Sequence, residues 1–129
     1  MISFTIWGDP KAQKRHAKGR WGNYDPSAGD KDNFLAKAIE NRPPTPFDFP
    51  VSVNIVAYFS RPKRHFTKKG LRPDAEIWYS SRPDADNVIK FILDALNGIF
   101  WKDDSFVSHV SLSKKYSKVP CIYMEIEKL

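Results

Sequence analysis

Residues 82–107 read RPDADNVIKFILDALNGIFWKDDSFV, and their pattern decides the second half of the fold. Apolar residues recur at helical spacing between Asp84 and Asn97, and Gly98 follows in the usual C-cap position. The core-facing stripe of this predicted helix consists of Val88, Ile92, Leu96 and Ile99. The opposite face carries the charged residues Asp86, Lys90 and Asp94, which are four residues apart. The stretch therefore predicts an amphipathic helix with one apolar and one charged side.

The rest of the chain supplies the partners of this helix. Alternating apolar residues predict strands at 2–7, 51–59, 106–116 and 121–127. A second helix is expected from Ser27 or Asp30 to about Asn41, and the prolines that follow end it. The polar stretches 8–26 and 61–73 are expected to be loops. The order β-α-β-α-β-β predicts an α+β fold, a small mixed, mostly antiparallel sheet with two helices packed on it, in a single domain over residues 1–129.

Composition narrows the class of protein. The chain has 129 residues, 41% of them hydrophobic, which is enough for one globular core. It has no apolar run near the ~20 residues that span a bilayer, and its first residues do not resemble a signal peptide. Its single cysteine, Cys121, excludes a disulfide within the chain. We therefore expect a protein of a reducing cytoplasm that has no membrane partner.

The basic residues are concentrated in two runs. Lys and Arg number 21 against 15 acidic residues, a net charge of +6. The first run consists of Lys11, Lys14, Arg15, Lys18 and Arg20, and the second of Arg61, Lys63, Arg64, Lys68, Lys69 and Arg72. Each run alone is compatible with a solvated loop. Two runs on either side of a carboxylate cluster favour binding of a phosphate backbone, because a polyanion has to be drawn toward acidic side chains.

The carboxylates Asp84, Asp86, Asp103 and Asp104 permit two interpretations. In the first, Asp84 caps the helix, the charged face is a ladder of ion pairs, and Asp103–Asp104 is an acidic turn. In the second, the carboxylates bind a divalent cation, which removes their mutual repulsion. Oxygen ligands suit Mg²⁺ or Mn²⁺, and the three histidines are too scattered for zinc. Lys90 would then neutralise charge in a phosphoryl transition state or orient the attacking water.

Three segments of the chain resemble the signature of one family. They are Arg82-Pro83-Asp84-Ala85-Asp86-Asn87-x-x-Lys90, Leu93-Asp94-Ala95-Leu96-Asn97-Gly98, and Trp101-x-Asp103-Asp104-x-x-Val107. This pattern, with Gly8-x-Pro10 near the start, resembles the RusA family of Holliday-junction resolvases from bacteria and their phages. The resemblance implies that Asp84, Asp86, Lys90 and Asp104 are catalytic, and that Asp84, Asp86, Asp104 and Asp103 bind metal. It also implies a homodimer that uses Mg²⁺, with Mn²⁺ as a substitute and no small-molecule cofactor, and nicks a four-way junction symmetrically.

Residues that contact DNA are harder to assign. The expected backbone contacts are Lys11, Lys14, Arg15, Arg61, Lys63, Arg64, Lys68 and Lys69. Arg82 is expected either to bind DNA at the scissile phosphate or to pair with a neighbouring aspartate. Trp21, Trp78 and Tyr79 either stack on unpaired bases or pack within the protein, whereas Trp101 is expected in the core. Two other functions remain open, a DNA-binding module without catalysis and a flap- or fork-selective nuclease with the same chemistry.

Overall fold

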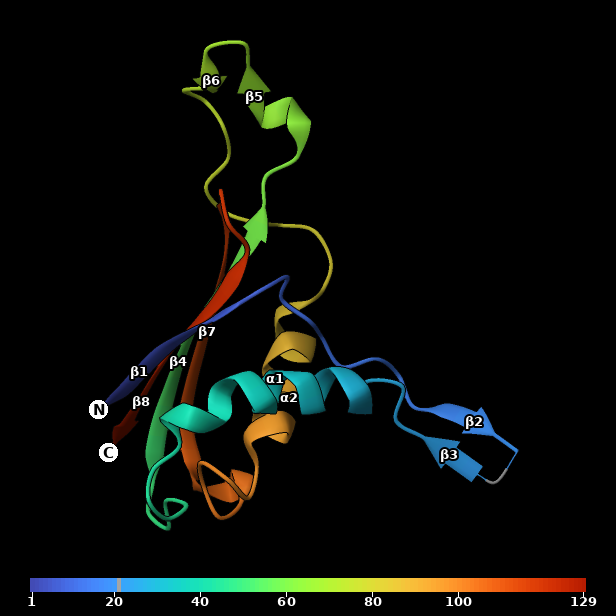
Figure 1. Cartoon of the computed structure of the whole chain (residues 1–129), viewed down its shortest axis with the longest axis vertical. Coiled ribbons are helices and arrows are strands. Elements are labelled where there is room, and N and C mark those ends of the chain that lie inside the picture. The colour runs from blue at the N-terminus through green and yellow to red at the C-terminus, as the bar shows by residue number, and fades with distance from the viewer. Residues whose placement is uncertain (21) are drawn as a thin grey trace.

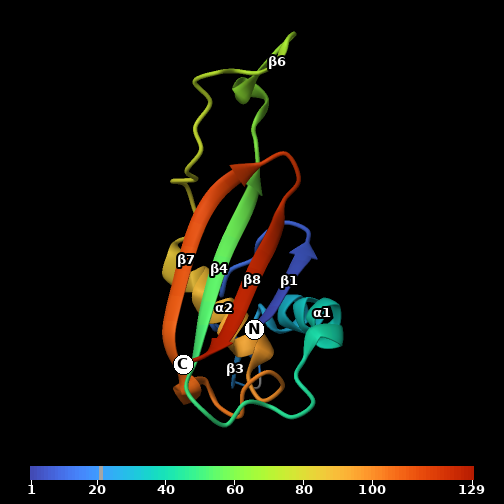
Figure 2. The same ribbon diagram turned by 90° about the vertical axis from the view of Figure 1, so that its left-hand side faces the viewer.

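Four strands form the main sheet, and both helices lie on one of its faces (Figure 1, Figure 2). The computed structural model describes residues 1–20 and 22–129. In spatial order the strands are β1 (Ile2–Trp7), β8 (Cys121–Lys128), β4 (Val51–Ser60) and β7 (Val107–Ser117). Strands β4 and β7 are parallel, whereas β8 is antiparallel to both β1 and β4. The predicted α+β fold with a mixed, mostly antiparallel sheet is therefore confirmed.

The two helices agree with the predicted ranges to within a few residues. They are α1 (Ala28–Ala38), which continues as the 3₁₀ turn η1 (Ile39–Asn41), and α2 (Ala85–Leu96). Helix α2 buries Val88, Phe91, Ile92, Ala95 and Leu96. The rings of Phe34 in α1 and Phe91 in α2 meet edge to face, with centroids 5.8 Å apart. No helix in the described part of the chain is long and apolar enough to cross a bilayer.

Strand β4 sets the register of the sheet. Its inward-facing residues Val51, Val53, Ile55, Ala57 and Phe59 are all buried, as the alternation predicts. Ile55 lies opposite Met124 of β8 and Leu112 of β7, so apolar side chains of three strands meet under the helices. A slip by one residue would turn the whole apolar set of β4 away from the helices. The hydrophobic pattern therefore fixes this register.

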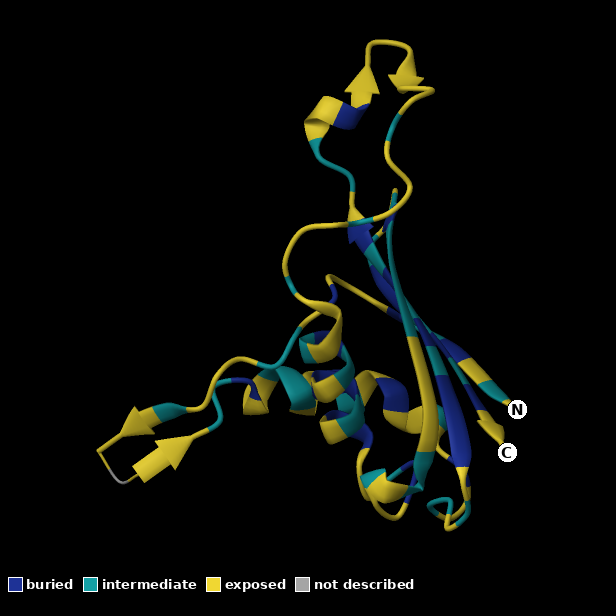
Figure 3. Cartoon of the chain, turned by 180° about the vertical axis from the view of Figure 1, so that it is seen from behind, coloured by how far each residue is buried: buried dark blue, intermediate teal, exposed yellow. Residues whose placement is uncertain are grey.

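Two stretches predicted as loops contain short hairpins instead. Within residues 8–26, β2 (Ala17–Gly19) pairs with β3 (Gly22–Tyr24). Within residues 61–73, the 3₁₀ turn η2 (Lys63–His65) precedes β5 (Phe66–Thr67) and β6 (Gly70–Leu71). Both hairpins extend away from the sheet and are largely exposed (Figure 1, Figure 3). Strands of two or three residues that pair only with each other have no buried face, so they leave no alternating pattern in the sequence.

Candidate active site and nucleic-acid interface

The chain is held firmly where it enters helix α2. Lys114 of β7 donates from Nζ to the carbonyl oxygens of Ser81 (2.9 Å) and Pro83 (2.7 Å). Asp84 occupies the N-cap position with extended backbone, but its side chain makes no capping hydrogen bond. The side-chain cap that the first interpretation assigns to Asp84 is therefore not formed. Its carboxylate, which is exposed, remains available for another partner.

The charged face of α2 is not a ladder of ion pairs. Among the described residues, no salt bridge joins Lys90 to Asp86 or Asp94. Asp94 instead accepts a hydrogen bond from Lys31 Nζ of helix α1 at 3.3 Å. Exposed Lys90 and Asp86 therefore present opposite charges on the outer surface of α2, where solvent or a ligand can reach them.

Lys31 joins three parts of the molecule. Besides Asp94, its Nζ contacts Asp25 Oδ2 at 2.7 Å, in the segment between β3 and α1. Burial alone would lower the pKa of Lys31, but the hydrogen bonds to Asp25 and Asp94, together with the charge interactions with these two groups, outweigh burial and raise it. The same contact from Lys31, helped by Gln13, holds the pKa of Asp25 well below its usual range. Lys31 and Asp25 are therefore both charged at neutral pH, and Lys31 ties the base of the β2–β3 hairpin to both helices.

The neighbours Asp103 and Asp104 have different environments. Asp103 Oδ2 accepts the backbone N–H of Ser105 at 3.0 Å, which caps the 3₁₀ turn η3 (Asp104–Phe106), and the hydrogen bonds from Ser105 lower its pKa. Asp104 Oδ1 accepts Nε1–H of Trp101 at 2.8 Å. Burial raises the pKa of Asp104, the charges of Asp94 and Asp103 raise it further, and the Trp101 bond opposes the shift. Asp104 is thus a carboxylate whose charge is poorly compensated, whereas Asp103 is engaged as a cap.

The first basic run lies directly against the acidic side of α2. The backbone N–H of Gln13 donates to the carbonyl of Asn87 at 2.9 Å, which fixes the segment beside the first turns of the helix. One cavity there is lined by, among others, Lys11, Lys14, Arg82 and Asp84. The next is lined by, among others, Lys14, Arg15, Lys90 and Asp94. Cations that are distant in the sequence from the aspartates thus share two cavities with them.

The donor chemistry suits a hard divalent cation, although the geometry is not that of an assembled metal site. In the described part of the chain, no three His, Cys, Asp or Glu side chains form a group that could hold a metal ion. Asp84 has no capping partner, and Asp104 lies in a negative environment that a cation would relieve. These two carboxylates therefore fit Mg²⁺ in type. The ligand set Asp84, Asp86, Asp103 and Asp104 stays a prediction. Asp103 is its least available member, because its side chain already caps the turn η3.

Comparison with known proteins identifies the family. The family model described as endodeoxyribonuclease RusA matches residues 8–127 of the chain. The chain belongs to the RusA endodeoxyribonuclease family. It is also similar to the uncharacterized protein YqaN of Bacillus subtilis (strain 168), at 33% identity over an alignment of 137 positions that covers 99% of this chain and 96% of YqaN. The match to the RusA family includes helix α2, the acidic turn after it and both hairpins.

The second basic run of this RusA-family chain divides into supporting and exposed residues. Arg61 donates from Nη1 to the carbonyl of Glu76 at 2.8 Å and lies over the ring of Tyr116, so it braces the base of the β5–β6 hairpin. Arg64 makes an exposed ion pair with Glu76 at 3.4 Å. The β5–β6 hairpin with its 3₁₀ turn η2, which we call the β5–β6 arm, also exposes Lys63, Lys68 and Lys69. These three lysines are better placed for DNA than Arg61.

The aromatic residues are mostly structural. Trp101 is completely buried, which confirms its predicted place in the core. Tyr79 stacks on Phe59 with ring centroids 3.8 Å apart, so it packs within the protein. Trp78 is exposed and carries the Lys115 ammonium over its ring at 4.9 Å. Trp21 lies outside the described residues.

Two positioning residues gave no signal in the sequence. Lys31 reaches Asp94 across 63 residues of chain, and Lys114 reaches Pro83 across 31. Each is one lysine among many in a basic protein, and each partner belongs to another element. Sequence periodicity describes one element at a time, so it could not have singled out either contact.

Proposed function

We propose that this member of the RusA family is a Mg²⁺-dependent endonuclease that acts as a homodimer and resolves four-way DNA junctions by paired symmetric nicks. The observation that supports this most is the contact between the first basic run and helix α2. The Gln13–Asn87 hydrogen bond places Lys11, Lys14 and Arg15 beside cavities that also contain Asp84 and Lys90. A phosphate bound by these cations would lie next to the carboxylates.

The proposed roles follow from charge and position. Asp84, Asp86 and Asp104 would hold the metal ion, which when bound supplies polarisation of the scissile phosphate. Lys90 projects from the same helix as Asp86 and, as a compact cation, would stabilise the charge that grows on the phosphate oxygens. The oxygen of the attacking water bonds to phosphorus as the bond from phosphorus to the 3′ oxygen breaks. The proton of the water passes to solvent, and the 3′ oxygen takes one up.

The dimer follows from the symmetry of the substrate. One chain contributes one set of carboxylates and one Lys90, which is enough to cut one strand. A four-way junction presents two equivalent strands related by a two-fold axis, so symmetric cutting needs two copies in the same relation. Non-specific affinity would come from the exposed lysines of the β5–β6 arm, whose phosphate contacts carry no sequence information.

The test is cleavage of an end-labelled four-way junction, with a linear duplex of the same sequence as the control substrate. The reactions contain Mg²⁺, Mn²⁺ or EDTA, and Asp86→Asn is the control variant. We expect paired nicks in the junction only, which require both the metal and Asp86. Asp84→Asn is expected to remove cleavage while junction binding survives, and an equal loss of binding would contradict its catalytic role.

The same experiment separates the alternatives. Binding that is indifferent to Mg²⁺ beyond screening, with no cleavage under any condition, would identify a DNA-binding module. Faster cleavage of flaps or forks than of four-way junctions would retain the chemistry and change the substrate. Lys90→Ala is expected to reduce turnover by orders of magnitude with little change in melting temperature, since the side chain is exposed. A large fall in melting temperature would show that Lys90 is structural.

A further inference from the structure

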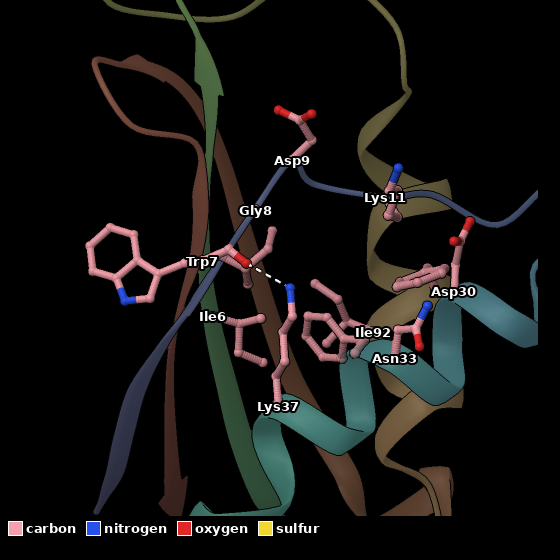
Figure 4. Close-up of a pocket in the computed structure, with 12 residues that line it drawn as sticks. Ile6, Trp7, Gly8, Asp9, Lys11, Asp30, Asn33, Lys37 and Ile92 are labelled. Atoms are coloured by element: carbon pink, nitrogen blue, oxygen red, sulfur yellow. Dashed lines mark hydrogen bonds between the residues drawn. The ribbon is translucent and has the colours of Figure 1, made fainter.

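A separate cavity of about 290 Å³ opens between the end of strand β1 and helix α1 (Figure 4). Its apolar lining comes from Ile6, Phe34, Phe91, Ile92 and Ile122, and its polar lining includes Asp9, Lys11, Asp30, Asn33 and Lys37. The Trp7 side chain points away from the cavity (Figure 4), while the Trp7 carbonyl accepts a hydrogen bond from Lys37 Nζ at 3.0 Å. The cavity thus combines a hydrophobic floor with a charged rim.

This combination selects a particular kind of ligand. The volume is at the small end of the range for small-molecule sites. Apolar and aromatic side chains suit the face of a flat ring, while Asn33 and Asp30 offer hydrogen bonds to polar atoms on its edge. Lys11 and Lys37 add positive charge for an anionic group attached to the ring. A single unpaired nucleotide has all three features.

The cavity lies next to the candidate active site. Lys11 and Asp30 line both this cavity and the neighbouring one that contains Arg82 and Asp84. A DNA strand whose phosphates follow the first basic run would therefore pass the mouth of the cavity on its way to Asp84. Bases next to a branch point are less costly to unstack than bases within a duplex. A branched substrate can therefore supply a base to this cavity more easily than a linear one.

We propose that this cavity holds one unpaired base of the DNA strand that enters the active site, so that the enzyme recognises a branch partly by capturing a base. This inference rests on the proposed function, because it assumes that DNA lies along residues 11–15. The base stacks over the apolar floor near Phe34 and Phe91. Asn33 contacts the edge of the base, and Lys37 contacts the adjoining phosphate.

The experiment uses four-way junctions that carry the fluorescent base 2-aminopurine at successive positions around the crossover, bound in EDTA so that no cleavage occurs. The full-length protein is expected to change the fluorescence strongly at one or two of these positions, because the captured base leaves its stack. In Asn33→Trp the indole fills the cavity, and we expect this change to disappear while the junction remains bound. Asp32→Trp introduces the same bulk at the neighbouring exposed position of α1, outside the cavity lining, and is expected to behave like the wild type.

A milder variant keeps the test valid if Asn33→Trp fails to fold. Asn33→Leu removes the amide with little change in size, and we expect about threefold to tenfold weaker junction binding from the lost hydrogen bond. Circular dichroism and melting temperature verify the fold of each variant. The inference would be overturned if the wild-type fluorescence change survives in Asn33→Trp. It would also be overturned if the wild type binds the junction and the 2-aminopurine fluorescence changes at none of the labelled positions. Failure of the wild type to prefer junction over duplex would instead contradict the proposed function itself.

Discussion

Replacing Trp101 with Phe removes one hydrogen bond from Asp104 and keeps an aromatic ring in the core. The lost bond, from Nε1 to Asp104 Oδ1 at 2.8 Å, favours the ionised carboxylate and opposes the burial that raises its pKa. A hydrogen bond to an ionised group contributes ~1.5–3 kcal/mol, and the lower end applies because Asp104 is only partly buried. We therefore expect the pKa of Asp104 to rise further in Trp101→Phe, because its ionised form loses ~1.5 kcal/mol of stabilisation.

The direct assay is a ¹³C NMR titration of the Asp104 side-chain carboxyl in the wild type and in Trp101→Phe. Trp78→Phe is the matched control, because Trp78 is exposed and its ring interaction is with Lys115. If the Trp101→Phe titration midpoint coincides with that of the wild type, the hydrogen bond does not stabilise the charge of Asp104 and the reasoning fails. This assay does not depend on nuclease activity.

Stability provides an independent measurement of the same effect. The pKa of Asp104 in the folded state lies above the unfolded value of 3.8, so the folded state binds the proton more tightly. Its contribution to stability therefore falls as pH rises from 3.8 through the folded-state pKa, and Trp101→Phe enlarges this fall. The packing cost of Trp101→Phe does not depend on pH, so it is the same at about pH 3 and at about pH 7. Urea denaturation should accordingly show a larger loss of stability at about pH 7 than at about pH 3, and an equal loss would leave only the packing cost.

Three further outcomes are expected. Lys31→Met should lower the melting temperature at neutral pH. The loss should shrink as pH falls below 3.8, because the folded-state pKa of Asp25 is depressed and Asp25 of the unfolded chain takes up its proton first. Lys31→Arg, which keeps the charge, should recover most of the lost stability, whereas a loss independent of pH would indicate packing alone. Leu96→Ala should cost about 2–5 kcal/mol in urea denaturation, since Leu96 is completely buried, and a cost below ~1 kcal/mol would mean that the helix repacks. Lys68→Gln and Lys69→Gln should each reduce the slope of log affinity against log salt by about 0.9 in filter-binding titrations, and an unchanged slope would place the β5–β6 arm away from DNA.

The main elements of the fold could be predicted because their signals are local. An apolar residue on every turn and a glycine after the last turn predict helix α2. Alternating apolar residues predict strand β4. The hairpins could not be predicted, since β2, β3, β5 and β6 bury almost nothing. The interpretation with a cap at Asp84 and an ion-pair ladder on α2 is not supported, because it assumes that a helix satisfies its charges with its own neighbours.

The sequence alone determined that an acidic, amphipathic helix of the RusA pattern belongs to a basic protein, because residue type and spacing are properties of one segment. Tertiary structure alone decided how those charges are paired. It placed Lys31 of α1 against Asp94, and residues 11–14 beside Asp84. It also created the cavity between β1 and α1, which no single element contains. These contacts join segments far apart in the chain, and only the packing of both helices on one face of the sheet brings them together.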